Sequence, residues 1–242
     1  MLIEVIEVFY RRFIKTLLLP QTPSMKAFIF DLNGTMIDDM TYHTRAWQNL
    51  LNNQLGGNFS WDEVKPQMYG KNQEVLVRMF GPNRFTLEEM HSLSLEKEKR
   101  YQEEFLPHLK LLPGLHEFLE KAYQQNIPMA IGTAAIPFNV DFVLDNLHIR
   151  HYFKAIVTAD DVTLSKPHPE TFLKAAELLN VPPTDCLVFE DVPKGAQAAE
   201  NADMKTVVIT TTHASEEFST TTGIIGFAAD FDAGFIKELL NK

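Results

Sequence analysis

The segment DLNGT, residues 31–35, places the carboxylate of Asp31 directly after an apolar run, AFIF. An aspartate at the end of a buried strand offers both a nucleophile and a ligand for a hard cation. Polar residues also follow later apolar runs: Thr133 in IGTAA, Lys166 in LSKPHPE, and Glu190 with Asp191 in FEDVPKG. Each of these residues alone is typical of a helix cap or a turn. Their recurrence after successive apolar runs indicates one site at a common edge of a sheet.

The elements that must position these residues alternate along the chain. We expect strands at residues 27–30, 128–132, 155–158, 186–189 and 206–209. Helical patterns cover residues 115–125, 138–147, 170–179 and 195–201. Near-continuous apolar strands with helical crossovers are typical of a parallel sheet that is covered on both faces. The sequence therefore predicts an α/β doubly wound fold, whose ligands bind beyond the carboxyl ends of the strands.

Residues 40–105 interrupt this alternation, because they contain no convincing strand. Their helical patterns cover residues 41–54, 72–80 and 87–105. We therefore expect a helical domain at 40–105, inserted between two parts of one α/β core domain, residues 25–39 and 106–242.

Residues 1–24 form a separate N-terminal extension. Its apolar residues recur at helical spacing from Ile3 to Leu17, and PQTPS, residues 20–24, is typical of a linker. Interspersed charges exclude a membrane span, which needs about 20 apolar residues. We expect an amphipathic helix that packs on the body or pairs subunits, and a surface membrane anchor is the alternative.

Composition limits the class of partner. The chain has 242 residues, of which 45% are hydrophobic, and a net charge of −10, which argues against nucleic acid as a ligand. The single cysteine, Cys186, excludes an internal disulfide framework and a cysteine-based zinc site. We expect a monomer or weak dimer in a reducing, cytoplasmic location.

The motifs DLNGT, IGTAA, SKPHPE and FEDVPKG together resemble the four motifs of the haloacid dehalogenase superfamily. The match is with its β-phosphoglucomutase-like phosphatase branch, and YHTRAW, residues 42–47, resembles the first cap helix of that branch. The resemblance covers about residues 25–242. It implies a Rossmann-like core with a helical cap, and a Mg²⁺-dependent phosphatase acting on a small phosphorylated metabolite such as a sugar phosphate.

The resemblance also implies catalytic roles. Asp31 would attack phosphorus and form an aspartyl-phosphate, which divides one difficult displacement into two easier steps. Thr133 would donate its hydroxyl to a phosphoryl oxygen. Lys166 would neutralise charge on Asp31 and on the transferring group.

Binding roles follow from the same resemblance. Gly34, Thr35 and Ala134 are assigned to loops that contact the phosphate, where backbone N–H groups approach it. Mg²⁺ would be held by Asp31, Asp191 and the backbone carbonyl of Asn33, with Glu190 as a further candidate.

Asn33 departs from the family pattern, because this position is normally an aspartate that protonates the leaving group and then activates water. An amide does neither, and loss of such help lowers rates by roughly 10²- to 10⁴-fold. Asn33 is compatible with mutagenesis that traps substrate, with natural slow or specialised chemistry, and with lost activity. The other motif residues favour a working phosphoryl site.

Three functions therefore stay open: a phosphatase, a phosphosugar mutase that returns the phosphoryl group to its substrate, and a catalytically impaired phosphate-binding protein. Glu190 and Asp191 argue against a metal-independent dehalogenase. A phosphonatase would need a cap lysine that forms a Schiff base, and Lys71 in MYGKNQ is the candidate. The ordinary interpretation of Lys71 is an exposed lysine or a contact to substrate phosphate.

The cap should determine the substrate. We expect four residues of MYGKNQ at the opening between cap and core: Tyr69, Lys71, Asn72 and Gln73. Gln73 aligns where mutases carry a basic residue for a second phosphate. His43 and Trp47 share one helix face. We expect Trp47 in the core of the cap and His43 either on the helix surface or as a polar contact that supplies a proton. LEKEKRYQEE, residues 95–104, predicts a solvated helix face.

Overall fold

The computed structural model describes residues 25–241. The N-terminal extension predicted at residues 1–24 lies outside the described residues. Among residues 25–241, no helix is both long enough and apolar enough to span a bilayer.

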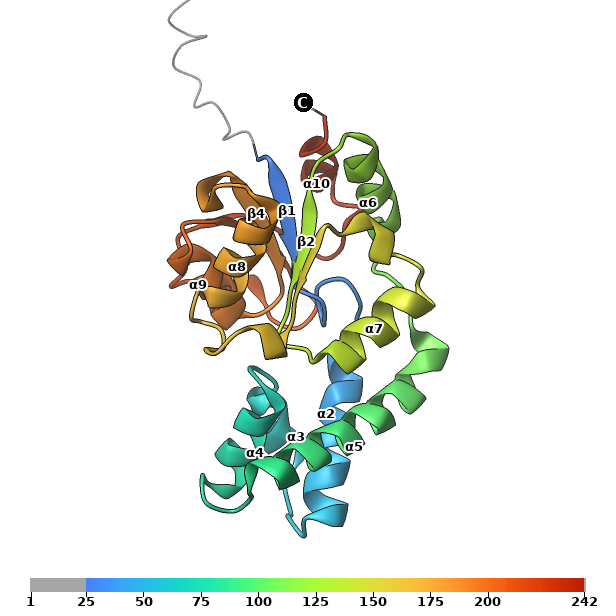
Figure 1. Ribbon diagram of the computed structural model, residues 1–242, viewed down its shortest axis with the longest axis vertical. Coiled ribbons are helices and arrows are strands. Elements are labelled where there is room, and N and C mark those ends of the chain that lie inside the picture. The colour runs from blue at the N-terminus through green and yellow to red at the C-terminus, as the bar shows by residue number, and fades with distance from the viewer. Residues whose placement is uncertain (1–24, 242) are drawn as a thin grey trace, which may run out of the picture.

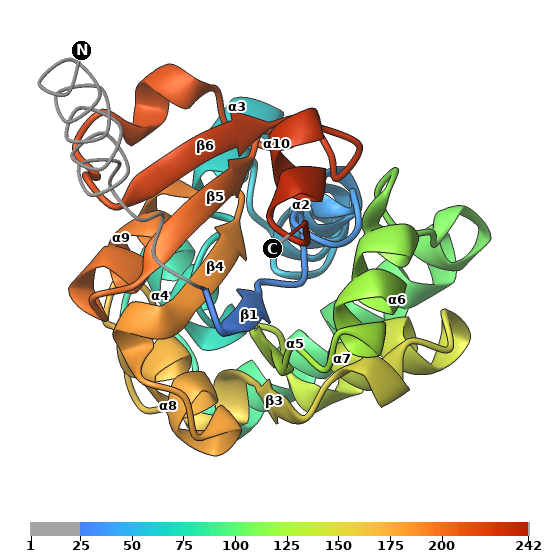
Figure 2. The ribbon, with the colours of Figure 1, turned by 90° about the horizontal axis from the view of Figure 1, so that it is seen from above.

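Residues 25–241 contain a six-stranded sheet in the order β3-β2-β1-β4-β5-β6, and every neighbouring pair is parallel (Figures 1 and 2). Its strands are β1 Ala27–Phe30, β2 Met129–Gly132, β3 Ala155–Val157, β4 Cys186–Glu190, β5 Lys205–Ile209 and β6 Ile224–Ala228. The chain leaves β1 toward β2 and β3 and returns to the other side of β1 with β4. The doubly wound α/β fold is confirmed.

Helices cover both faces of the sheet (Figure 2). One apolar cluster joins alternate β1 residues, Phe28 and Phe30, to α6 Leu115–Gln124, α7 Pro137–Asn146 and α10 Gly234–Glu238. The other joins Ala27 and Ile29 to α8 Glu170–Leu179 and α9 Pro193–Asn201. Because β1 is buried on both faces, its sequence is apolar throughout, and the first polar residue after it marks the sheet edge.

Aromatic rings hold β1 and β4 side by side below that edge. Phe30 and Phe189, one from each strand, stack with their ring centroids 4.8 Å apart and their planes at 6°. Phe118 of α6 packs against both rings. Asp31 and Glu190 follow Phe30 and Phe189 directly, so this packing fixes the backbone from which both carboxylates project.

Four of the α-helices that lie between β1 and β2 form a group apart from the sheet (Figure 1). They are α2 Met40–Asn49, which continues as a π-helix at Leu50–Gln54, α3 Trp61–Val64, α4 Asn72–Phe80 and α5 Leu87–Phe105. Their own apolar cluster includes Trp47, Leu50 and Leu76, so the core position expected for Trp47 is confirmed. We call residues 40–105 the cap and propose that it is a separate domain.

Three elements were not anticipated from the sequence: α3, β6 and α10. The edge strand β6 escapes detection because Ile225 and Phe227 are exposed and Gly226 divides them, so no continuous apolar run is formed. Both α3 and α10 are short, with four and five residues. The helical pattern that identifies an amphipathic helix needs a longer stretch.

Candidate active site

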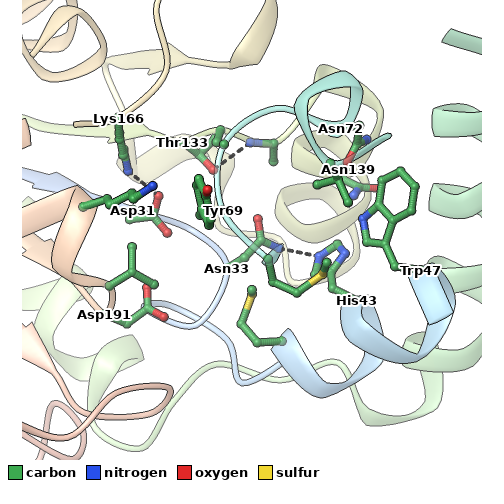
Figure 3. Close-up of a pocket in the computed structure, with 18 of the residues that line it drawn as sticks. Asp31, Asn33, His43, Trp47, Tyr69, Asn72, Thr133, Asn139, Lys166 and Asp191 are labelled. Carbon is green, nitrogen blue, oxygen red and sulfur yellow. Dashed lines mark hydrogen bonds and ion pairs between the residues drawn. The ribbon is translucent and has the colours of Figure 1, made fainter. Parts of the chain in front are cut away.

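The predicted polar residues meet at the carboxyl edge of the sheet, facing the cap (Figure 3). Asp31 follows β1, Thr133 follows β2, and Glu190 ends β4 with Asp191 directly after it. Lys166 reaches the same place from the loop that follows β3. These strands are neighbours in the order β2-β1-β4, which explains why residues far apart in sequence share one cavity of about 110 Å³.

Lys166 links two of the carboxylates. Its Nζ donates to Asp31 Oδ1 at 2.6 Å and to Glu190 Oε1 at 2.8 Å, and all three side chains are buried. Burial raises the pKa of Asp31 to about 7, although the charge of Lys166 acts in the opposite direction. Burial alone would lower the pKa of Lys166, but the attraction of Asp31 and Glu190 raises it above its ordinary value. The ammonium charge is therefore firmly held beside Asp31.

Glu190 is held in place by further donors. Its Oε2 accepts from the backbone N–H groups of Asp191 at 2.7 Å and Val192 at 2.8 Å. Gly195 leaves room for this carboxylate, because a Cβ there would lie 1.7 Å from Glu190 Oε1. Both oxygens of Glu190 thus already accept hydrogen bonds from the protein, and the carboxylate serves to position Lys166.

Asp191 is held by two hydroxyls and a glycine. Thr35 Oγ1 donates to its Oδ1 at 2.9 Å, and Thr212 Oγ1 donates to its Oδ2 at 2.5 Å. Gly34 has φ +79°, and a Cβ on it would lie 2.1 Å from Asp191 Oδ2. Burial, together with the charges of Glu190 and Asp31, raises the pKa of Asp191 well above its ordinary value. Gly34 and Thr35 therefore act on Asp191 and do not line the cavity.

This donor set suits a divalent cation. Three buried carboxylates, those of Asp31, Glu190 and Asp191, lie around the buried ammonium group of Lys166, which pairs with two of them. Within residues 25–241 no group of three or more His, Cys, Asp or Glu side chains is arranged as a complete metal site. Mg²⁺ fits nonetheless, because it commonly takes one or two carboxylates and fills its octahedron with water and substrate oxygens. Asp31, Asp191 and the backbone carbonyl of Asn33 are the candidate ligands.

The amide of Asn33 lies in a polar cluster where the chain passes from the core into the cap. Its Nδ2 donates to Asp39 Oδ2 at 2.6 Å and lies 3.1 Å from His43 Nε2. Asp39 is fully buried and also accepts from Tyr101 OH at 2.5 Å, while the Tyr101 ring stacks on His43 at 3.8 Å. The surface position considered for His43 is wrong, because its ring is buried and lines the cavity.

The solvated face predicted for residues 95–104 is right for Lys99, Glu103 and Glu104, which are exposed, but wrong for three other residues. Lys97, Glu98 and Tyr101 are 2%, 3% and 0% exposed, and the first two line the cavity. Buried residues on α5 recur at helical spacing: Met90, Ser94, Lys97, Glu98, Tyr101 and Phe105. This helical spacing could have revealed the buried face of α5 in the sequence. Lys97 and Glu98 lie within it, however, and charged residues are typical of an exposed face.

The segment of residues 69–73, which leads into α4, contains residues that line the cavity and a residue that ties the cap to the core. Tyr69 and Asn72 line the cavity, whereas Lys71 and Gln73 do not. Lys71 Nζ donates to the backbone carbonyl of Val162 at 2.5 Å, which ties the cap to the loop after β3. This engagement argues against Lys71 as a Schiff base, and the structure places neither Lys71 nor Gln73 where it would touch a ligand in the cavity.

Ala134 and Thr212 also belong to the candidate site. Ala134 lines the cavity directly after Thr133, whose Oγ1 accepts from the backbone N–H of Ala135 at 3.1 Å (Figure 3). Thr212, which was not singled out from the sequence, follows β5. The rule of inspecting each strand end, applied to this last predicted strand, would have found it.

Comparison with known proteins identifies the family. The profile of the haloacid dehalogenase-like hydrolases matches residues 28–209. The fructose-1-phosphate phosphatase YqaB of Escherichia coli is 33% identical over 190 residues, which cover 74% of this chain and 93% of that protein. A β-phosphoglucomutase of Bacillus subtilis is also 33% identical, over 188 residues that cover 74% of this chain and 81% of the relative. The chain belongs to the haloacid dehalogenase-like hydrolases.

A solved structure agrees with this assignment. The crystal structure of a family IA hydrolase from Entamoeba histolytica superposes with a TM-score of 0.78 at 26% identity, covering 90% of this chain and all of that one. Sequence and fold therefore identify the same class of hydrolase, and its first motif carries Asn33 in this chain.

The contact between Gly34 and Asp191 leads to a prediction. Gly34→Ala should lower the rate of phosphate release by about a hundredfold, because a displaced Asp191 misplaces the reacting groups. Gly56→Ala is the matched control: its φ is +73°, but no atom lies within 4 Å of the added Cβ. Both variants carry the backbone strain of about 1 kcal/mol, and only the first should lose activity. Equal losses in both variants, or none in Gly34→Ala, would contradict the role given to this contact.

Proposed function

We propose that the chain is a Mg²⁺-dependent phosphatase that hydrolyses a small phosphorylated metabolite, with a sugar phosphate as the leading class, through an aspartyl-phosphate on Asp31. The observation that carries this proposal is the buried carboxylate of Asp31, held by Lys166 at 2.6 Å on the sheet edge that also bears Thr133 and Asp191. Relatives named as phosphatases and as β-phosphoglucomutase support the substrate class. A cytoplasmic location and a monomer or weak dimer stay predictions.

In the first step Asp31 attacks phosphorus. Lys166 holds Oδ1, so we assign the attack to Oδ2; a bond from Oδ2 to phosphorus forms while the bond from phosphorus to the leaving oxygen breaks. Thr133 and Lys166 stabilise the charge on the phosphoryl oxygens. Bound Mg²⁺ would further neutralise that charge. The leaving oxygen must then take up a proton, which Asn33 cannot supply.

In the second step water attacks the aspartyl-phosphate. The bond between phosphorus and Asp31 breaks, inorganic phosphate is released and the carboxylate is restored. Asn33 cannot remove the proton from that water, so the step should be slow. A mutase would instead return the phosphoryl group to a second substrate hydroxyl, and the positions of Lys71 and Gln73 outside the cavity give that alternative less support.

The proposal predicts phosphate release that depends on Mg²⁺ and on Asp31. Incubation with a panel of phosphorylated metabolites should release phosphate from at least one of them. EDTA or the substitution Asp31→Asn should abolish that release, while formation of an isomer in place of phosphate would indicate a mutase. Release that persists in Asp31→Asn would refute the nucleophile, and no release from any member would favour an impaired phosphate-binding protein.

Asn33 makes a second prediction about leaving groups. Without a general acid, the rate should fall as the leaving group becomes more basic, so a nitrophenolate departs without help and a sugar alkoxide does not. Asn33→Asp should therefore accelerate sugar phosphates by roughly 10²- to 10⁴-fold and nitrophenyl phosphate much less.

Two checks make this comparison decisive. Mass analysis of the peptide that contains Asn33 and Gly34 must first show an intact amide, because this pair is prone to deamidation. Equal acceleration of both substrate types, or of neither, would show that residue 33 does not occupy the acid–base position.

A further inference from the structure

Two adjacent charged residues of α5 form the charged part of the cap-side wall of the cavity. Lys97 Nζ lies 3.0 Å from both carboxylate oxygens of Glu98, and both side chains are buried. Asn72 of the cap donates to Glu98 Oε1 at 2.7 Å, and Asn139 of α7 donates to Oε2 at 2.6 Å (Figure 3 labels both amides). Glu98 therefore accepts four hydrogen bonds and connects the cap to the core.

Glu98 also cancels the charge of Lys97. Burial lowers the pKa of Lys97, and the carboxylate of Glu98 acts against this shift. Burial alone would raise the pKa of Glu98, but Lys97 and His43 hold it below its ordinary value. The pair is thus an ion pair of zero net charge, surrounded by amides and by the imidazole of His43.

Other cations near the cavity do not replace the charge that Glu98 cancels. Lys71 is engaged by the carbonyl of Val162, away from the cavity. Arg78 donates to the carbonyls of Gln67 and Tyr69. Lys194 also lines the cavity, but it is a residue of the core: it lies at the start of α9, three positions after Asp191, and its Nζ is 3.4 Å from the centroid of the Tyr69 ring.

We infer that Glu98 sets the substrate class, by making the cap-side wall neutral so that the cavity selects a monophosphate with an uncharged, hydroxyl-bearing remainder and disfavours a second phosphate. The inference rests on the proposed function for the orientation of the substrate, with its phosphoryl group at Asp31. Side-chain amides recognise hydroxyls by hydrogen bonding, whereas a second phosphate is bound best by an uncompensated cation. Replacing Glu98 should therefore shift selectivity toward a bisphosphate, and replacing Lys97 should shift it toward a monophosphate.

The test measures binding by calorimetry for fructose 1-phosphate and fructose 1,6-bisphosphate, on the Asp31→Asn background so that neither ligand is consumed. All variants are measured at pH 6.0, because acidic conditions favour the charged form of Lys97, whose pKa is lowered by burial. Glu98→Gln leaves the charge of Lys97 uncompensated. The ratio of the two affinities should shift toward the bisphosphate by roughly tenfold, as expected when one unit charge attracts a phosphate in a partly buried site.

Lys97→Gln should shift that ratio toward the monophosphate, and the double variant should return it close to the starting value. The matched control is Glu96→Gln, since Glu96 lies on the same helix, pairs with Arg100 and does not line the cavity. A merely structural role for Glu98 would weaken both ligands alike, or move the ratio in the same direction in both single variants.

Either of those results, an unchanged ratio, or failure of both ligands to bind would overturn the inference. Turnover of fructose 1-phosphate by the chain without substitutions is measured separately. Its absence would count against the proposed function, while the binding ratios would still decide the role of Glu98.

Discussion

The ammonium group of Lys166 is shared by Asp31 and Glu190, which lie at the carboxyl ends of two neighbouring strands, and the candidate site depends on this buried contact. Removing three charged groups from water is costly, so the pairing is stable only where the surrounding structure fixes its geometry. The stacked rings of Phe30 and Phe189 fix the two strand ends, and Gly195 leaves space for the Glu190 carboxylate. The packing of the sheet below its carboxyl edge thus fixes the positions of the charged groups at that edge.

A second buried ion pair, Lys97 with Glu98, lines the same cavity, and the two clusters differ in net charge. The core side carries more carboxylates than cations and gains from a divalent cation, which in turn favours a phosphoryl group. The cap side is neutral and is held by the amides of Asn72 and Asn139. Under the proposed function, the core side of the cavity would carry out the chemistry and the cap side would recognise the rest of the substrate.

The core of the site could be predicted because parallel strands display whatever follows them at one edge. Asp31, Thr133, Lys166 and Asp191 were found in this way. Lys97 and Glu98 were missed because the charge pattern of α5 is the same for a solvated helix and for one whose charges pair in a cavity. Tertiary packing alone distinguishes the two, and it also decides that Lys71 contacts Val162 and not the cavity.

The central claim is that Asp31 becomes phosphorylated and that Asn33 makes hydrolysis of this aspartyl-phosphate slow. Acid quenching during turnover, followed by mass analysis of the peptides, tests this claim most directly. The account predicts one phosphoryl group on the peptide that contains Asp31, with a larger fraction modified in the chain that has Asn33 than in Asn33→Asp. A phosphoryl group on a different residue would contradict this claim, and so would substrate turnover with no phosphorylated peptide in either protein.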